Sequence, residues 1–264
     1  SWSWVILLVT AVLNLLFKAA AMADSTLLEA VNWAVLNAVV SMSQFGRMWG
    51  YGMVLILLSG ILFWIYRRIW ASPQDSSKGL ILLYVGIALS AFLMFTISNS
   101  GHAAAVTEWK AVALGTDALH LLATAMWVGG LFYLFLLMRS LRSADPEMRA
   151  RLMGEVVPRF SRMAQFCVGT ILLTGAYTTW IHMPSWGAFV DTWYGIALLT
   201  KILLFLPLIA LGAVNLLVIK PQLTQNLVEQ GERALEGALG ILKRFGSLVQ
   251  AEISLGVVIL LVVV

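Results

Sequence analysis

The segment 117–138 reads DALHLLATAMWVGGLFYLFLLM, and after Asp117 it contains no Asp, Glu, Lys or Arg. About 20 consecutive apolar residues in a helix are enough to cross the hydrocarbon core of a bilayer. The run therefore predicts a membrane-spanning helix, which we place at 112–138. Its apolar residues are continuous instead of alternating, which disfavours a β-barrel strand.

The rest of the chain has the same character. Of its 264 residues, 61% are hydrophobic and 11% are charged, and the mean hydropathy is +0.90. Soluble domains are far less apolar. We expect an all-α fold, a polytopic transmembrane helix bundle of about seven spans plus one interfacial helix. The other spans are expected at 2–17, 47–66, 80–98, 160–181, 193–219 and 246–264.

Residues 27–44 interleave apolar and polar side chains, which predicts a helix with one apolar face lying in the membrane interface. A full span is the alternative. We expect one integral membrane domain over 1–264, with the first span and the interfacial helix in 1–45 and the main bundle in 46–264. Both ends of the chain are apolar, so both termini are expected to be truncated.

The basic residues predict the orientation of the spans. The segments 67–78, 139–162 and 220–244 hold 13 of the 17 Lys and Arg residues. Because cytoplasmic loops of membrane proteins are enriched in Lys and Arg, these segments are placed inside. His102 and the loop with His182 then share the outer face. The net charge of +4 reflects this distribution and does not predict nucleic-acid binding.

The three histidines are the first candidates for chemistry. Coordinating side chains at membrane depth are costly and are a functional hypothesis by default. His102 follows Gly101 at the end of one apolar run, and His120 lies about eight residues into the next span. Asp117 precedes His120 by three residues, on the same helix face, where it would fix the imidazole tautomer and leave the other nitrogen for a metal. The alternative is an Asp facing the interface and a His bonded to a neighbouring helix.

His182 and Met183 are adjacent in a predicted outer loop. Imidazole binds copper, and thioether sulfur suits the cuprous ion. Glu252, inside the last span, could be an inner metal ligand, a proton acceptor or the partner of a cation, including an Arg at the cytoplasmic edge. Lys201 is expected to be structural, paired with an acid such as Asp117 or Asp191.

Three further residues bear on the predicted path. Met94 and Met126 fall near it, although Met in a span is usually packing. Trp127 lies seven residues after His120 and could wall the site. The lone Cys167 excludes an internal disulfide and any multi-Cys metal site. A P-loop, a dinucleotide fingerprint, a zinc-protease helix and a hydrolase elbow are all absent from the sequence, which disfavours nucleotide-driven pumping by this chain.

Several motifs together resemble the copper resistance protein D (CopD) family over roughly residues 45–264. They are Gly101-His102-Ala103-Ala104, Leu119-His120 with Trp127-Val128-Gly129-Gly130, Arg159-Phe160-Ser161-Arg162, Leu173-Thr174-Gly175, Trp193-Tyr194-Gly195 and Leu242-Lys243-Arg244 with Glu252. The resemblance implies a bacterial inner-membrane protein that moves copper or hands it to a partner. That partner would be a small periplasmic copper-binding protein of the CopC type or another membrane copper protein.

The resemblance points to His102, His120 and Glu252 as the characteristic polar residues. The family commonly has a histidine in an additional N-terminal span, and residues 1–17 contain none. We expect a copper ion to enter at His102 with His182 or Met183, to pass to His120, and to meet Glu252 further in, without enzymatic chemistry. The alternatives are an accessory subunit of a larger membrane copper enzyme and a b-type haem cytochrome with two histidine ligands.

Overall fold

The computed structural model describes residues 2–70, 76–101, 109–183, 185–228 and 232–262. These residues are helical or lie in short connections, which confirms the all-α prediction. The chain forms two compact units, residues 1–122 and 123–264. The boundary falls within helix α6, Lys110–Ser140, so each unit contains one part of that helix.

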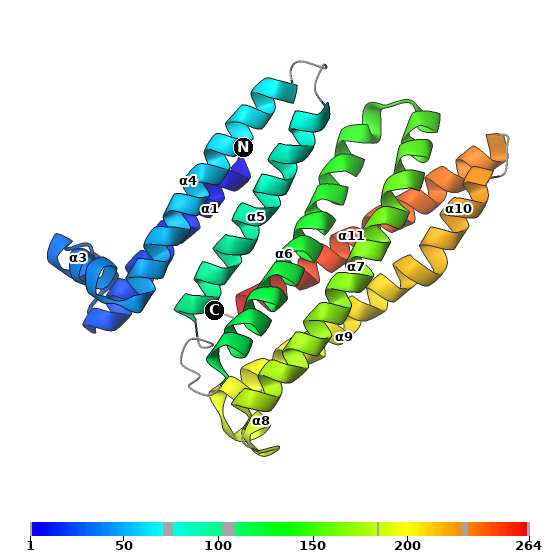
Figure 1. The fold of residues 1–264 in the computed structure, drawn as a ribbon. Coiled ribbons are helices and arrows are strands. Elements are labelled where there is room, and N and C mark those ends of the chain that lie inside the picture. The colour runs from blue at the N-terminus through cyan, green and yellow to red at the C-terminus, as the bar shows by residue number, and fades with distance from the viewer. Residues whose placement is uncertain (1, 71–75, 102–108, 184, 229–231, 263–264) are drawn as a thin grey trace. The chain divides into compact units, whose positions relative to one another are not determined.

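The first unit is built on three long helices, α1 (Trp2–Ala23), α4 (Gln44–Trp70) and α5 (Ser76–Ser100). Helix α4 packs against both α1 and α5 (Figure 1). Two indole N–H groups join α1 to α4, because Trp4 donates to the carbonyl oxygen of Ile56 and Trp49 donates to that of Ala11, both at 2.8 Å. Indole is therefore both a large apolar contact and a satisfied donor between these helices.

The expected interfacial helix over 27–44 forms as two helices, α2 (Leu27–Ala30) and α3 (Trp33–Met42). Thr26 and Glu29 make a capping box at the start of α2, and the Asn32 side chain accepts a hydrogen bond from Ala34 N–H at the start of α3. Because Asn and Thr compete for backbone groups, these caps end one helix and begin the next. With ten residues, α3 is too short to span a bilayer, so the full-span alternative is excluded.

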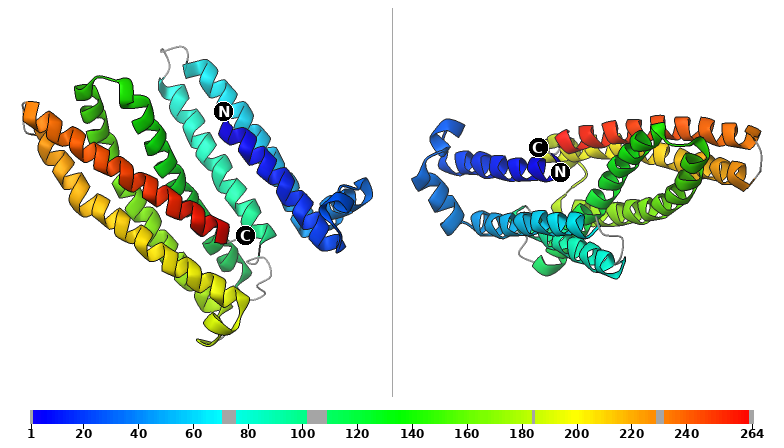
Figure 2. Two further views of the ribbon diagram at one scale, coloured as in Figure 1. Left: turned by 180° about the vertical axis from the view of Figure 1, so that it is seen from behind. Right: turned by 90° about the horizontal axis from the view of Figure 1, so that it is seen from above.

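The second unit contains the remainder of α6 and five further helices. They are α7 (Pro146–His182), α8 (Ala188–Asp191), α9 (Trp193–Val214), α10 (Lys220–Val228) and α11 (Glu232–Val262). A π-helical turn, η3 (Asn215–Ile219), joins α9 to α10 without a break. Helix α11 lies along α9, η3 and α10 and also contacts α7 (Figure 2).

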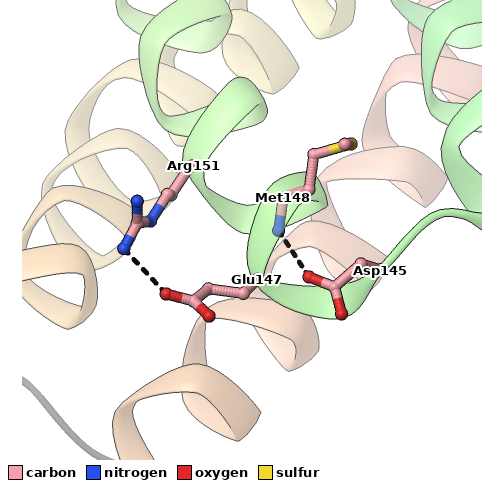
Figure 3. A network of polar contacts seen from close by, with 4 residues as sticks. All are labelled: Asp145, Glu147, Met148 and Arg151. Carbon is pink, nitrogen blue, oxygen red and sulfur yellow. Dashed lines mark hydrogen bonds and ion pairs between the residues drawn. The ribbon is translucent and has the colours of Figure 1, made fainter.

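The basic segment after α6 is more helical than expected. A short 3₁₀ turn, η2 (Leu141–Ser143), follows α6, and α7 then begins at Pro146. Most of residues 139–159, the segment between the spans expected at 112–138 and 160–181, is therefore helix. Asp145 caps α7 by accepting a hydrogen bond from Met148 N–H at 3.0 Å, and Glu147 pairs with Arg151 at 2.7 Å (Figure 3). Pro146 stands at the first helical position, where its missing N–H costs nothing. Pro158 lies inside α7, and the helix continues through it.

Six helical segments are long and apolar enough to cross a membrane among the residues described: Ser3–Ala23, Gln44–Arg68, Ser77–Ser100, Lys110–Ser143, Trp193–Asn226 and Arg233–Leu261. They correspond to six of the seven expected spans. The seventh, 160–181, is the second half of α7, which does not meet the same criterion because its polar and charged residues lower the hydropathy. The chain is therefore a multi-pass membrane protein.

The core of the second unit is a continuous apolar cluster from α6, α7, α9, η3, α10 and α11. Trp127, Leu131 and Phe245 are each less than 5% exposed. Gly130 lets α7 approach α6 closely, since an added Cβ would lie 2.6 Å from the ring of Phe160 and 2.9 Å from Met163. In a membrane, small residues of this kind hold helices together by close packing.

Candidate functional site

The predicted entry histidine, His102, lies outside the described residues. His120 is half-buried on α6, in the first unit, and Asp117 is half-buried three residues before it on the same continuous helix. Residues three apart in a helix share a face. The helix therefore puts the two side chains side by side as expected, and the role of Asp117 in orienting His120 stays a prediction.

The three residues expected along the path differ in their surroundings. Met94 is half-buried on α5, whereas Met126 is 45% exposed on α6. Trp127 is buried in the core of the second unit, where its ring meets that of Phe205 edge-on at 5.8 Å. Trp127 thus has a clear packing role, and its place beside a metal path stays a prediction.

His182 is the final residue of α7, and Met183 caps that helix through its N–H, which donates to the carbonyl oxygen of Thr179. Nδ1 of His182 lies 2.9 Å from the carbonyl oxygen of Thr178. Because a carbonyl oxygen only accepts, Nδ1 must carry the proton, and the neutral ring then keeps its lone pair on Nε2. This arrangement orients an imidazole for a metal ion, with the Met183 thioether next to it in the chain.

The ring of Tyr194 lies beside this end of α7, with its centroid 6.3 Å from that of His182. Both His182 and Met183 are half-buried. The short helix α8 and the start of α9 pack together here, because Gly195 has no Cβ to strike the backbone of Ala188. The second unit therefore gives His182 a defined environment, and whether it faces outward from the membrane stays a prediction.

Lys201 is half-buried on α9, inside the predicted span. Within the described part of the second unit it forms no ion pair with Asp191, which is exposed at the end of α8. A long aliphatic stem allows a lysine to bury its methylenes and extend its charge toward a polar region.

Glu252 is the most deeply buried charged residue described, with 2% of its surface exposed. Its carboxyl oxygen Oε1 accepts a hydrogen bond from Nδ2 of Asn215 at 2.5 Å. Asn215 is itself 9% exposed, and its other side-chain atom, Oδ1, has no hydrogen-bond partner among the described residues. Amide and carboxyl oxygens suit hard cations better than soft cuprous ions. As a copper ligand, Glu252 therefore stays a prediction from sequence alone.

Asn215 is the residue that the sequence reasoning missed. The sequence did contain a signal for it. Asn215 is the one strongly polar side chain in the apolar run 203–219, which reads LLFLPLIALGAVNLLVI. A polar side chain at that depth should have a partner on another helix. Considering Asn215 together with Glu252 would have predicted the contact between η3 and α11.

Among the described residues, no three His, Cys, Asp or Glu side chains gather into a group able to hold a metal ion. In the first unit, an open hollow of about 540 Å³ lies between the end of α1 and α3, lined by Met22, Ala23, Val35, Ala38, Val39, Met42 and Ser43. Its wall offers two thioethers without an imidazole or a carboxylate. The described candidates are therefore single sites or pairs, and a tight multi-ligand centre is not seen in this part of the chain.

Two family models match the chain. Residues 154–264 match copper resistance protein D, and residues 1–112 match the copper resistance protein D-like N-terminal domain. The chain belongs to the copper resistance protein D family. The family resemblance predicted from the motifs is thereby confirmed, and the N-terminal match also includes residues 1–44, which the resemblance over 45–264 did not cover.

Two curated relatives carry copper-related names. The chain is 37% identical over 131 residues to the copper transport protein CutJ of Bacillus subtilis (strain 168), an alignment that covers 49% of this chain and 23% of that protein. It is 26% identical over 233 residues to copper resistance protein D of Pseudomonas syringae pv. tomato, covering 86% of this chain and 70% of that protein. The chain thus spans about a quarter of the first relative and most of the second. No solved structure matches it.

Some of the candidate residues lie within the two family matches and others do not. His182, Met183 and Glu252 lie within the C-terminal match, as does Asn215, and His102 lies within the N-terminal match. His120 falls in residues 113–153, between the two matches. Membership in the family therefore supports copper handling by the chain as a whole and assigns no role to any one residue.

Proposed function

We propose that this chain moves copper ions across a bacterial inner membrane, taking them from the periplasmic face. The observation that carries the proposal is that two models of one copper resistance family match 1–112 and 154–264 of a multi-pass membrane chain. The function is transport of an ion, with copper as the cargo, and it requires no catalytic residue.

The proposed ligands are the three histidines and one thioether. His182 is the best supported, because its Nδ1 donates to Thr178 and its Nε2 remains available to a metal. Met183 adds the sulfur that the cuprous ion prefers. His102 and His120 are proposed as further sites, with Asp117 orienting His120. Sites with few ligands suit conduction, because an ion must bind well enough to enter and weakly enough to leave.

The proposed partner at the outer face is a small periplasmic copper-binding protein of the CopC type, or another membrane copper protein. The family resemblance supports this partner. An accessory role in a larger membrane copper enzyme is the competing function, and copper movement by the purified chain separates the two.

The test is copper uptake into liposomes that contain the purified protein. Cuprous ion is supplied outside with a reductant, and the copper inside is measured after chelating the external metal. We expect His182→Ala, Met183→Leu and His120→Ala to slow uptake. Met148→Leu, an exposed methionine at the other end of α7, is the matched control and should behave as wild type. Uptake no faster than in empty liposomes, from a correctly folded wild type, would overturn the proposal.

A further inference from the structure

The contact between Asn215 and Glu252 raises a chemical question that copper ligation does not answer. Glu252 is buried in α11, and its single described partner is a neutral amide from η3. An ionised carboxylate in a low-dielectric interior needs a cation or several donors to offset the loss of hydration. Asn215 supplies one donor. The site as described leaves an ionised Glu252 poorly compensated.

The side-chain oxygen of Asn215 also lacks a partner among the described residues. Oδ1 is an acceptor, it is buried, and it has no donor among the described residues. Buried acceptors in native proteins have partners, so a donor or a cation belongs here. A proton on Glu252 supplies one, because a carboxylic acid is a donor as well as an acceptor.

An acid and an amide have complementary bonding groups. The amide N–H donates to the acid carbonyl, as Nδ2 of Asn215 does to Oε1 of Glu252, and the acid O–H can donate to the amide oxygen. We propose that Asn215 and Glu252 form a proton-binding site within the membrane, in which Glu252 carries the proton at neutral pH and donates it to Oδ1 of Asn215. Both polar atoms of the amide are then satisfied.

The local backbone supports a functional reading of this pair. Asn215 is the first residue of the π-helical turn η3, the one such turn among the described helices. Single π-turns are rare and occur often at functional sites. The turn lies opposite α11 in the second unit, so a wider backbone segment and a buried acid meet at one place.

The charged and titratable groups on the elements packed against this site do not provide a counterion in the described structure. They are Tyr194 and Lys201 of α9, Lys220 of α10, Arg233, Glu236, Lys243 and Arg244 of α11, and Glu147, Arg149, Arg151, Glu155, Arg159, Arg162, Cys167, Tyr177 and His182 of α7. The ion pairs described for these elements join residues of α7 to each other. Lys243 and Arg244 lie eight or nine residues from Glu252 on its own helix, about 12–14 Å along the axis at the usual helical rise.

The proton site gives copper movement a means of coupling, and this step rests on the proposed function. Loss of the proton breaks the O–H bond of Glu252 and leaves a carboxylate, with the proton passing to water on one side of the membrane. A positive copper ion elsewhere in the bundle would favour that loss, since it stabilises negative charge. We infer that copper and protons move in opposite directions through this unit.

Infrared spectroscopy tests the proton directly and needs no copper. Wild-type protein in lipid nanodiscs should show at neutral pH the carbonyl stretching band of a protonated carboxylic acid, shifted in heavy water. The band should be lost in Glu252→Gln and displaced in Asn215→Leu. Glu236→Gln, the same change at an exposed position of α11, should keep it. A wild type without the band, or a band that persists in Glu252→Gln, would overturn the proton site.

Two further measurements keep the outcome decisive. If Glu252→Gln does not fold, the carboxyl carbon of glutamate in isotope-labelled wild type reports by solid-state NMR whether a protonated Glu is present. In liposomes with a trapped pH dye, copper entry should drive proton exit in wild type and in Glu236→Gln, and not in Glu252→Gln. Proton exit that persists in Glu252→Gln overturns the coupling. Absence of copper entry in every sample defeats the proposed function and leaves the infrared result to decide the proton site.

Discussion

The hydrogen bond between Asn215 and Glu252 should couple the stability of η3 to that of α11, and a double-mutant cycle can measure this coupling. Asn215→Leu and Glu252→Met keep the side-chain volumes close to those of the wild type, so the cavity contribution is small. Asn215→Leu leaves the Glu252 carboxyl group without its described partner, and Glu252→Met leaves both Nδ2 and Oδ1 of Asn215 without a partner among the described residues. Each single change should therefore remove a bond and expose an unsatisfied polar group to an apolar interior.

The magnitude follows from the burial of both residues. An unsatisfied buried polar group costs about 1–3 kcal/mol in mutational series. Hydrogen bonds between membrane helices average about 0.6 kcal/mol, with a maximum near 1.7. We expect each single variant to lose about 1–2 kcal/mol of unfolding free energy. The double variant has no polar atom left at the site, so its loss should be smaller than the sum of the singles by about 1 kcal/mol.

Reversible unfolding in mixed detergent micelles, followed by circular dichroism, gives the four free energies. Gln250→Leu is the control, because Gln250 is exposed on α11 two residues before Glu252, and a surface change should stay within about 0.5 kcal/mol. Additive losses in the double variant, or single variants as stable as Gln250→Leu, would refute the reasoning, since they would show that the two side chains do not interact.

Two other predictions concern packing and pH. Gly130→Ala should destabilise the second unit by about 1–3 kcal/mol, because its new Cβ overlaps side chains of α7. The new Cβ of Gly129→Ala meets open space, so this control variant should be neutral or stabilising by up to about 1 kcal/mol. Unfolding of both variants in detergent compares them. Outside the spans, two hydrogen bonds from Thr26 lower the pKa of Glu29. The bond from the backbone N–H has the larger effect, and the bond from the hydroxyl has the smaller one. The ionised Glu29 carboxylate should therefore stabilise α2 at pH values above the ordinary Glu pKa, and this stabilisation should vanish as the pH falls through the lowered pKa. An NMR titration in which Glu29 behaves as an ordinary glutamate would disprove it.

The spans could be predicted from sequence because their signal is local. A continuous apolar run such as 117–138 leaves a helix as the one simple way to satisfy its backbone in lipid. The helix limits were less predictable. The cap at Asn32 divides the helix expected over 27–44 in two, and Asp145 with Pro146 begins α7 within a segment expected to connect two spans. Each of these outcomes depends on one side chain bonding to a nearby backbone group, which periodicity does not register.

The candidate site divides in the same way. His182 could be selected from sequence by residue type, but the bond that fixes its tautomer requires the helix register of α7, which places Thr178 one turn earlier. The burial of Glu252 was expected from its position in an apolar run, whereas its partner was not, because Asn215 is 37 residues away on a different helix. Contacts between helices depend on how the helices are rotated, and a single sequence does not fix that rotation.

Metal analysis with an optical spectrum of the purified protein tests the central claim most directly. Wild type, His120→Ala and His182→Ala should be loaded with cuprous ion, washed and compared beside the Met148→Leu control. The copper-handling account predicts bound copper in wild type and control, less copper in both histidine variants, and no Soret band in any sample. A Soret band that disappears with the same histidines, or copper content equal in all four proteins, would contradict it.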